Sequence, residues 1–379
     1  MTKILFFATN FYPYHGGLEH YVLHLAKRLA SRGIKVDVLT YNVHDIKEYE
    51  EHEGIGIYRI PCYDLMKDVY SLPKFNRKTK EVFRKLEKNN YDFVITQTRF
   101  FSTSYLGMRF ARRNNIKFIH TEHGNVFVKH DKKYIEIFAL LYDLTIGRKI
   151  FREADKVIGI SRACCNFAKK MGADKKKVYY IPNSVDTNMC SPMAEEKKIE
   201  IRKALKIRQD SFIISYVGRL IYAKGLQDLI EAVKGTNYIL LLMGQGPYRK
   251  KLRELADKYK VKAIFLGDTN HKDVMDYLNV SDIFVNPSYS EGLPTSVLEA
   301  GSCGLPVVAT NVGGTGEIID SRSGFLYEPK DVETLKKMIN VLRKDKELRN
   351  RFSSHIRKKI VREFDWDRNV DRYIKEILK

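Results

Sequence analysis

The chain alternates short apolar runs with amphipathic helical stretches along almost its whole length. Six runs in its first half are typical of short buried strands: Lys3–Ala8, Lys35–Thr40, Phe93–Thr96, Lys117–Thr121, Lys156–Ile160 and Val178–Ile181. Helical patterns such as Leu18–Ser31 and Thr79–Lys88 lie between these runs. Strands that alternate with helices in this way favour a doubly wound α/β domain with a mostly parallel sheet.

A second series of the same kind begins near residue 211. Its predicted strands are Phe212–Val217, Tyr238–Met243, Ala263–Leu266, Ile283–Asn286 and Pro306–Thr310. A chain of 379 residues is long enough for two domains, each with its own core. We therefore expect two Rossmann-like domains of similar size, an N-terminal one over residues 1–190 and a C-terminal one over residues 191–361. The tail Ile356–Lys379 is predicted to be helical.

The net charge of +21 indicates attraction to something anionic, with a larger excess in residues 1–190. A membrane, a nucleic acid or a polyanionic substrate would each fit, and so would a merely lysine-rich surface. Two basic stretches, Lys67–Lys88 and Lys129–Lys156, could lie on an anionic leaflet, the second because it also carries aromatic and aliphatic residues. A solvated helix face with an apolar core face would look the same.

The sequence contains no apolar run long enough to span a bilayer. Its first apolar run is predicted to be a buried strand rather than a signal peptide, because Tyr12-Pro13 ends it early. The five cysteines form no Cys-x-x-Cys pair and no metal-binding spacing. We expect a cytoplasmic protein, either free or at the cytoplasmic face of a membrane, with no bound metal.

Glu291 and Glu299 stand eight residues apart around Gly292 and Pro294. The glycine breaks the chain and the proline suits the first turn of a helix, which predicts one carboxylate in a loop and the other on the helix that follows. The free N–H groups of such a helix start attract phosphate. One carboxylate could meet sugar hydroxyls on one side of a diphosphate, and the other a ribose on the far side.

Two further loops follow predicted strands, where open α/β sheets bind ligands. Arg219 and Lys224 could grip a diphosphate from two directions, or could simply be solvated surface charges. Gly16 and Gly17 open the first helix, where backbone can approach a phosphate closely, although a tight turn alone would also use two glycines.

His123 ends the run Lys117–Thr121 and could hydrogen-bond a sugar hydroxyl or a developing charge. A packed structural histidine, or a metal ligand together with His120 or Glu122, are the alternatives. A metal is disfavoured because no other ligand cluster accompanies these residues.

Taken together, these segments resemble family-4 retaining glycosyltransferases with the GT-B fold, in which two Rossmann-like domains face each other across a cleft. The resemblance covers nearly the whole chain in the right order. It is carried by Gly16-Gly17, Ile181–Asp186, Gly218-Arg219 with Lys224-Gly225, Ser290–Ala300 and Pro306–Glu317. The family often has an acidic residue after the histidine, where this chain has Gly124.

The resemblance implies a UDP- or GDP-linked sugar donor and no cofactor. Arg219 and Lys224 would bind the diphosphate, Glu299 the ribose and Glu291 the transferred sugar. The backbone of Gly16, Gly17, Gly292 and Leu293 would complete the phosphate site, and His123 would lie near the sugar. The acceptor would bind the N-terminal domain, and a C-terminal helix at about 362–379 would return to that domain.

The expected activity is a metal-independent, retaining hexosyltransferase reaction (EC 2.4) in cell-envelope polysaccharide, glycolipid or lipid-linked glycan synthesis. Alternatives are a nucleotide-sugar epimerase of the same fold and a non-catalytic relative that binds membrane or carbohydrate. A nucleic-acid-binding protein rests on charge alone, since no recognition motif is present.

Overall fold

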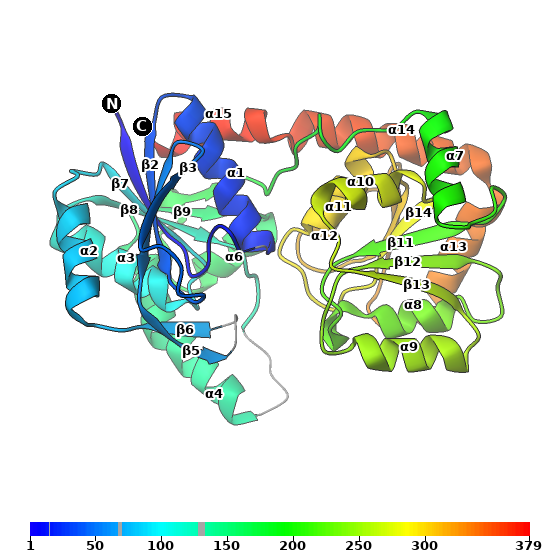
Figure 1. Cartoon of the computed structure of the whole chain (residues 1–379), viewed down its shortest axis with the longest axis horizontal. Coiled ribbons are helices and arrows are strands. Elements are labelled where there is room, and N and C mark those ends of the chain that lie inside the picture. The colour runs from blue at the N-terminus through cyan, green and yellow to red at the C-terminus, as the bar shows by residue number, and fades with distance from the viewer. Residues whose placement is uncertain (15, 67–69, 128–132) are drawn as a thin grey trace. The chain divides into compact units, whose positions relative to one another are not determined.

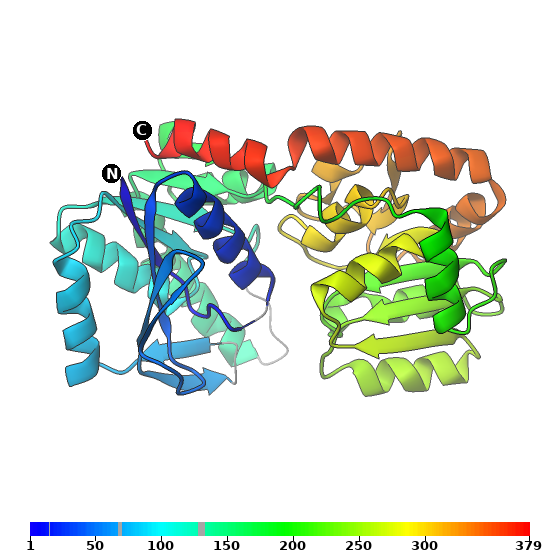
Figure 2. The ribbon, with the colours of Figure 1, turned by 45° about the horizontal axis from the view of Figure 1, so that its top comes forward.

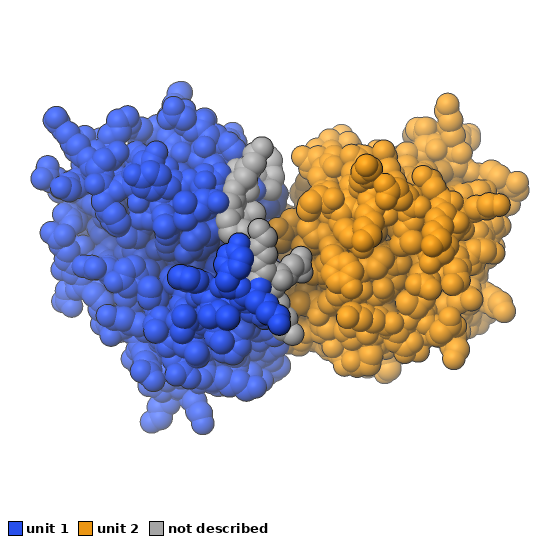
Figure 3. Space-filling model, turned by 90° about the horizontal axis from the view of Figure 1, so that it is seen from below, with its two compact units in different colours: residues 1–183, 366–379 blue, residues 184–365 orange. Residues whose placement is uncertain are grey.

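The computed structural model describes residues 1–14, 16–66, 70–127 and 133–379. They form two compact units, coloured separately in Figure 3. Unit 1 comprises residues 1–183 and 366–379, and unit 2 comprises residues 184–365. The last helix of the chain therefore belongs to the same unit as the first strand. Within the described ranges, no helix combines the length and the apolar composition needed to cross a membrane.

Unit 1 is built around an eight-stranded sheet with the order β10-β9-β8-β7-β1-β2-β4-β3 (Figure 1). Neighbouring strands are parallel except β3 and β4, which are antiparallel. The strands are β1 (Lys3–Phe7), β2 (Lys35–Tyr41), β3 (Tyr49–His52), β4 (Ile55–Ile60), β7 (Phe93–Gln97), β8 (Lys117–Glu122), β9 (Lys156–Gly159) and β10 (Val178–Tyr180). A separate antiparallel hairpin pairs β5 (Cys62–Met66) with β6 (Tyr70–Pro73).

The helices of unit 1 cover both faces of this sheet. From the centre of the sheet, α1 (Gly17–Ser31) leads from β1 to β2 and α3 (Ser102–Arg113) leads the other way, from β7 to β8. Because such crossovers are right-handed, α1 and α3 lie on opposite faces. The remaining helices are α2 (Arg77–Glu87), α4 (Lys133–Tyr142), the π-helix Asp143–Gly147, α5 (Arg148–Glu153), α6 (Arg162–Lys170) and α15 (Trp366–Ile377), which packs against α1.

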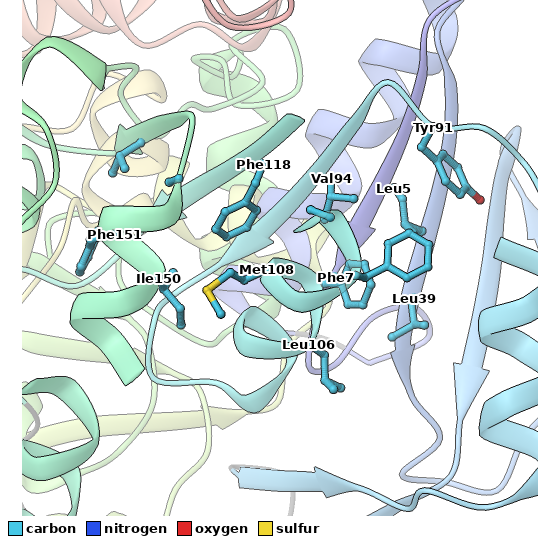
Figure 4. Close-up of a cluster of buried hydrophobic side chains, with 14 of the residues drawn as sticks. Leu5, Phe7, Leu39, Tyr91, Val94, Leu106, Met108, Phe118, Ile150 and Phe151 are labelled. Carbon is cyan, nitrogen blue, oxygen red and sulfur yellow. The ribbon is translucent and has the colours of Figure 1, made fainter. Parts of the chain in front are cut away.

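The core on the α3 face explains why these apolar runs become strands. Leu5, Phe7, Val94 and Phe118 project from the central strands into one buried cluster with Met108 of α3, as Figure 4 shows. Residues of α2, α5 and α6 complete this cluster. The central strands are apolar on both faces because helices bury both.

Unit 2 repeats the plan with six parallel strands in the order β13-β12-β11-β14-β15-β16. The strands are β11 (Ile213–Val217), β12 (Ile239–Met243), β13 (Lys262–Gly267), β14 (Ile283–Asn286), β15 (Val307–Thr310) and β16 (Gly324–Tyr327). The helices, seen again in Figure 2, are α7 (Glu195–Ala204), α8 (Leu226–Ala232), α9 (Arg249–Lys258), α10 (His271–Asn279), α11 (Thr295–Ser302), α12 (Thr315–Ile318), α13 (Val332–Lys344) and α14 (Lys346–Glu363).

The predicted fold class of two doubly wound α/β domains is confirmed, but several elements differ from the prediction. Strands β3 to β6 and β16 were not expected from the sequence. In β4 the apolar pattern is interrupted by Arg59, which is nevertheless buried and donates to the carbonyl oxygen of Tyr12. The predicted single tail helix is two helices, because α14 ends at Glu363 and α15 begins at Trp366.

Each sheet has a central point from which the chain proceeds in opposite directions. In unit 1 this switch point lies between β1 and β7, and in unit 2 between β11 and β14. The loops that leave the two strands there turn toward opposite faces of the sheet, which opens a crevice at their carboxyl ends. These two loop pairs are where ligand-binding residues are expected.

Candidate active site

The switch point of unit 2 carries an ion pair between two of the predicted site residues. Lys224 ends the 3-10 helix Tyr222–Lys224 after β11, and Glu291 lies in the loop after β14. The Lys224 Nζ atom lies 2.7 Å from Glu291 Oε1. Their side chains are 22% and 11% exposed, so both groups remain accessible to a ligand.

A close backbone contact joins the two loops. Gly225 has φ +67°, and a Cβ atom at this position would overlap the carbonyl oxygen of Pro287. The Tyr289 N–H donates to the carbonyl of Ala223 over 2.9 Å. The Lys224 loop therefore requires glycine at 225 in order to reach the Glu291 loop.

A second glycine contact supports Glu291 from the loop after β15. Gly313 has φ +58°, and a Cβ atom there would overlap the carbonyl oxygen of Glu291. The N–H of Gly314 donates to the carbonyl of Gly292 over 2.7 Å. The glycine pair 313–314 thus holds the backbone of the predicted sugar-binding loop.

Buried polar side chains orient the Glu291 carboxylate. The Asn286 amide nitrogen lies 3.4 Å from Glu291 Oε1, and the Ser288 hydroxyl donates to the Asn286 amide oxygen over 3.0 Å. The hydroxyl of Thr310 in turn donates to the carbonyl of Ser288. This chain of hydrogen bonds leaves Glu291 fewer orientations than a surface glutamate has.

Arg219 presents a cation near the same strand end. Its side chain is exposed, and it forms no ion pair with any residue that the structure describes. Its backbone carbonyl accepts a hydrogen bond from the hydroxyl of Tyr216 in β11 over 3.3 Å, which holds the loop against that strand. Its planar guanidinium can therefore bind an anion at two points.

Glu299 lies on α11, as predicted, and its partner is a residue that the sequence did not single out. His271, the first residue of α10, places Nε2 2.9 Å from Glu299 Oε1. The hydrogen bond to Glu299 raises the pKa of His271 above its usual value. His271 comes directly after Asn270, whose side chain caps α10. An asparagine before a helical pattern is a helix-start signal, and it could have placed His271 in the first turn of a helix from the sequence.

The start of α11 fits the expected anion site. Pro294 occupies its N-cap position, and no side chain caps the helix there. The Leu293 side chain is buried, and Gly292 is partly exposed. The helix begins at Thr295, directly after the proline.

In unit 1 the predicted residues gather at the other switch point. Gly16 is the N-cap of α1, which begins at Gly17, and a Cβ atom on Gly17 would meet nothing within 4 Å. The backbone at Gly17 is therefore open to a ligand. His15, which precedes this pair, lies outside the described residues.

His123 follows β8 and contacts both β7 and the helix α1. Its Nε2 lies 2.8 Å from the amide oxygen of Gln97 at the end of β7. The ring meets Tyr21 of α1 edge-on, with centroids 4.8 Å apart. Burial lowers the pKa of His123 to about 4, so the imidazole is neutral near pH 7. Because an amide oxygen only accepts, Nε2 carries the proton and Nδ1 is the acceptor.

The residues beside His123 form a buried charge network. Arg99 lies 3.1 Å from Glu122 and 2.9 Å from Asp143 of the π-helix, and all three are almost fully buried. His120 is held between Thr96 and Glu122. Among the described residues, no group of three or more His, Cys, Asp or Glu side chains could hold a metal ion.

Comparison with known proteins identifies the family. Residues 15–189 match the model described as Glycosyltransferase Family 4, and residues 197–359 match Glycosyl transferases group 1. An uncharacterized glycosyltransferase of Methanocaldococcus jannaschii is 32% identical over 98% of this chain and 97% of its own length. The UDP-Gal:alpha-D-GlcNAc-diphosphoundecaprenol alpha-1,3-galactosyltransferase of Escherichia coli is 30% identical over 80% of this chain and 79% of its own.

The solved structures agree on the fold. Sucrose-phosphate synthase from Thermosynechococcus elongatus superposes with a TM-score of 0.83 at 21% identity, covering 99% of this chain and 98% of that one. Such a likeness establishes the GT-B arrangement of two Rossmann-like domains, and the family matches establish the reaction class. The chain therefore belongs to the family-4, group 1 glycosyltransferases and is a transferase of the EC 2.4 kind.

Proposed function

We propose that the protein is a retaining, metal-independent glycosyltransferase that moves a sugar from a UDP- or GDP-linked donor to an acceptor hydroxyl. The observation that carries this proposal is the accessible ion pair between Lys224 and Glu291 at the switch point of unit 2. It holds a cation for phosphate and a carboxylate for sugar hydroxyls on adjoining loops, beside the start of α11.

The donor diphosphate would bind to the cations and to the helix start. Arg219 offers a fork of donors and Lys224 a point charge, and the first turn of α11 adds N–H groups and the positive end of the helix dipole. Family analogy adds backbone groups at Gly16, Gly17, Gly292 and Leu293. These fixed charges would stabilise the diphosphate as it leaves, which is the task that a divalent ion performs in other transferases.

The two carboxylates would divide the rest of the donor. Glu291, oriented by Asn286, would accept hydrogen bonds from hydroxyls of the transferred sugar. Glu299, held by His271, would accept from the ribose hydroxyls. Both carboxylates keep an anchored oxygen while binding, which reduces the entropy lost when the donor is ordered.

The transfer step would break the bond between the anomeric carbon and the diphosphate oxygen and form a bond to the acceptor oxygen on the same face. The acceptor proton would pass to the leaving phosphate oxygen, and the sugar would carry oxocarbenium-like charge between the two events. Glu291 would orient the sugar rather than attack it. The neutral imidazole of His123 would hydrogen-bond a sugar hydroxyl near the reacting centre.

The acceptor is proposed to be lipid-linked or a glycan, in cell-envelope polysaccharide, glycolipid or lipid-linked glycan synthesis. The Escherichia coli relative is named for a diphosphoundecaprenol-linked acceptor. Unit 1 also exposes apolar side chains on α4, including Tyr134 at 62% and Phe138 at 76%, next to the basic segment that starts α5. We propose that this surface contacts an anionic leaflet at the cytoplasmic face of a membrane.

The donor site is tested by a hydrolysis screen over nucleotide sugars, read by the released nucleoside diphosphate. One sugar nucleotide should be cleaved slowly without acceptor, and Glu291→Gln should reduce this rate and the transfer rate by about 100-fold or more. Glu333→Gln, an exposed glutamate on α13, is the matched control and should behave like the wild type. An isomerised donor without acceptor would instead indicate an epimerase.

The membrane contact has its own test. The protein should sediment with liposomes that contain anionic phospholipid at low salt, and less so at high salt because the charges are then screened. Absence of sedimentation at low salt would contradict the membrane contact and would leave the donor chemistry untouched.

A further inference from the structure

Unit 1 contains a cavity of about 730 Å³ that belongs to neither switch point. It lies between α2, α3, β6 and the π-helix, and its walls are mainly apolar. Phe83 of α2, Tyr105 and Leu106 of α3, Leu72 of β6 and Ile146 contribute to them. The volume is that of a small-molecule site, large enough for much of a hydrocarbon chain.

Four exposed cations stand around this apolar cavity. Lys80 and Arg84 lie four residues apart on α2, and Arg109 and Arg113 lie four residues apart on α3. Like charges at this spacing share one helix face and destabilise the helix by a few tenths of a kcal/mol per pair. Glu87 is the one acidic residue among the lining residues, and it lies 4.0 Å from Arg113. The charge is thus in excess of what folding needs, which favours an anionic ligand.

The mouth of the cavity continues into exposed apolar surface. Phe75, which lines the cavity, is 71% exposed. Tyr142 and Ile146 line it from the chain segment that carries the exposed apolar residues of α4. Figure 1 shows α4 and the β5–β6 hairpin at the same end of unit 1. A ligand entering here would come from an apolar phase rather than from free solution.

We propose that this cavity holds one acyl chain of an anionic phospholipid from the leaflet, with the lipid phosphate on the cations of α2 and α3. An apolar interior with a basic rim matches the two parts of such a lipid, and neither a free phosphate nor an uncharged lipid would use both. The inference rests on the membrane contact proposed above, since the lipid is drawn from that leaflet. The lipid would anchor unit 1 beside the α4 surface.

The experiment uses the full chain and soluble short-chain lipids below their micelle concentration. Calorimetric titration should show one dihexanoyl phosphatidylglycerol bound per chain. The affinity for dihexanoyl phosphatidylcholine should be lower by a factor of about ten or more. The double variant Arg84→Glu with Arg109→Glu, called the rim variant below, should bind phosphatidylglycerol with an affinity lower by a factor of about ten or more. The matched control, Lys175→Glu with Lys176→Glu, changes the charge equally at exposed positions outside the cavity and should bind normally.

A second variant tests the apolar part independently. Leu72→Trp should narrow the cavity and weaken the binding of both lipids, while the variant Arg84→Glu with Arg109→Glu should weaken mainly the binding of the anionic one. Equal phosphatidylglycerol binding by the rim variant and its control would overturn the proposal. Binding of farnesyl phosphate without phosphatidylglycerol would overturn it too, because the occupant would then be a prenyl lipid.

Donor hydrolysis, measured on the same samples, separates this inference from the proposed function. The rim variant should hydrolyse the donor at the wild-type rate, because the proposed diphosphate ligands Arg219 and Lys224 are unchanged. If the wild type hydrolyses no nucleotide sugar, the transferase proposal fails, while the calorimetric result still decides the lipid site.

Discussion

The two units place charged side chains at equivalent strand ends but use them differently. In unit 1, Arg99 is buried between Glu122 and Asp143 and forms an ion pair with each of them. In unit 2, the Lys224–Glu291 pair is partly exposed, and the Arg219 side chain is exposed. An ion pair by itself therefore does not mark a ligand site, and the pair that we propose as part of the donor site is one that remains accessible.

Burial explains the difference. A carboxylate loses its hydration free energy on burial and needs other interactions to offset that loss. For Glu122 these are contacts with Arg99, His120 and the N–H of Gly124. Arg99 holds the pKa of Glu122 down at about 2 against the effect of burial. Such a network cannot exchange a partner without a large penalty. Lys224 can exchange Glu291 for a phosphate at small cost because water reaches both.

The largest effect is expected from breaking the buried network. Arg99→Met would leave Glu122 and Asp143 buried without their cation, and should reduce the free energy of unfolding by about 3–5 kcal/mol. Denaturant titration followed by circular dichroism measures this. Arg112→Met, which removes an exposed pair with Glu153, is the control and should cost no more than about 1 kcal/mol. Similar losses in both variants would invalidate the comparison.

The opposite pattern is expected at the accessible pair. Lys224→Ala should lower the transfer rate by about 100- to 1,000-fold, because the leaving diphosphate loses a cation. Its free energy of unfolding should change by less than about 1 kcal/mol. Lys234→Ala, which breaks an exposed pair with Glu231, should alter neither quantity. A Lys224 variant that unfolds readily would make this pair structural as well.

His123 should make unit 1 acid-sensitive. Its folded pKa of about 4 lies below the value of about 6.5 expected when unfolded, so the unfolded chain binds more protons between these values. Stability should therefore fall by up to about 3 kcal/mol as the pH drops from 6.5 to 4. In His123→Asn this part of the pH dependence should vanish. His44→Asn, at an exposed position, should retain the wild-type curve.

The smallest effect is expected at the second carboxylate of unit 2. Because the pKa of His271 is raised, its cation holds Glu299 at low pH and is lost as the pH rises through that pKa. The KM for the donor should therefore increase with pH by a few-fold, and kcat should change little. In His271→Gln the KM should be higher at low pH and nearly pH-independent. If the dependence of KM on pH is the same in this variant as in the wild type, His271 has no role in donor binding.

Much of the fold could be predicted because apolar runs and helical periodicity are local properties. The positions of Arg219, Lys224 and Glu291 at strand ends followed from the same pattern, since parallel strands end at one edge of the sheet. Their pairing did not follow, because it depends on β11 and β14 being neighbours, and their runs are separated in sequence by two other strands.

Other features could not be predicted because only the tertiary contact defines them. Arg99 looks like any arginine after a strand, and nothing in its neighbours reveals that Asp143 will reach it. The role of Gly313 in supporting Glu291 depends on a carbonyl 22 residues earlier in the chain. The apolar cavity combines α2, α3 and the π-helix, which are likewise distant in sequence.

The position of Trp366 decides which unit can be observed optically. It is the one tryptophan of the sequence, and it lies in α15 against Tyr21 and His24 of α1. Tryptophan-selective fluorescence therefore reports on unit 1 and on the packing of α15 against α1. Unit 2 contains no tryptophan and contributes nothing to this signal.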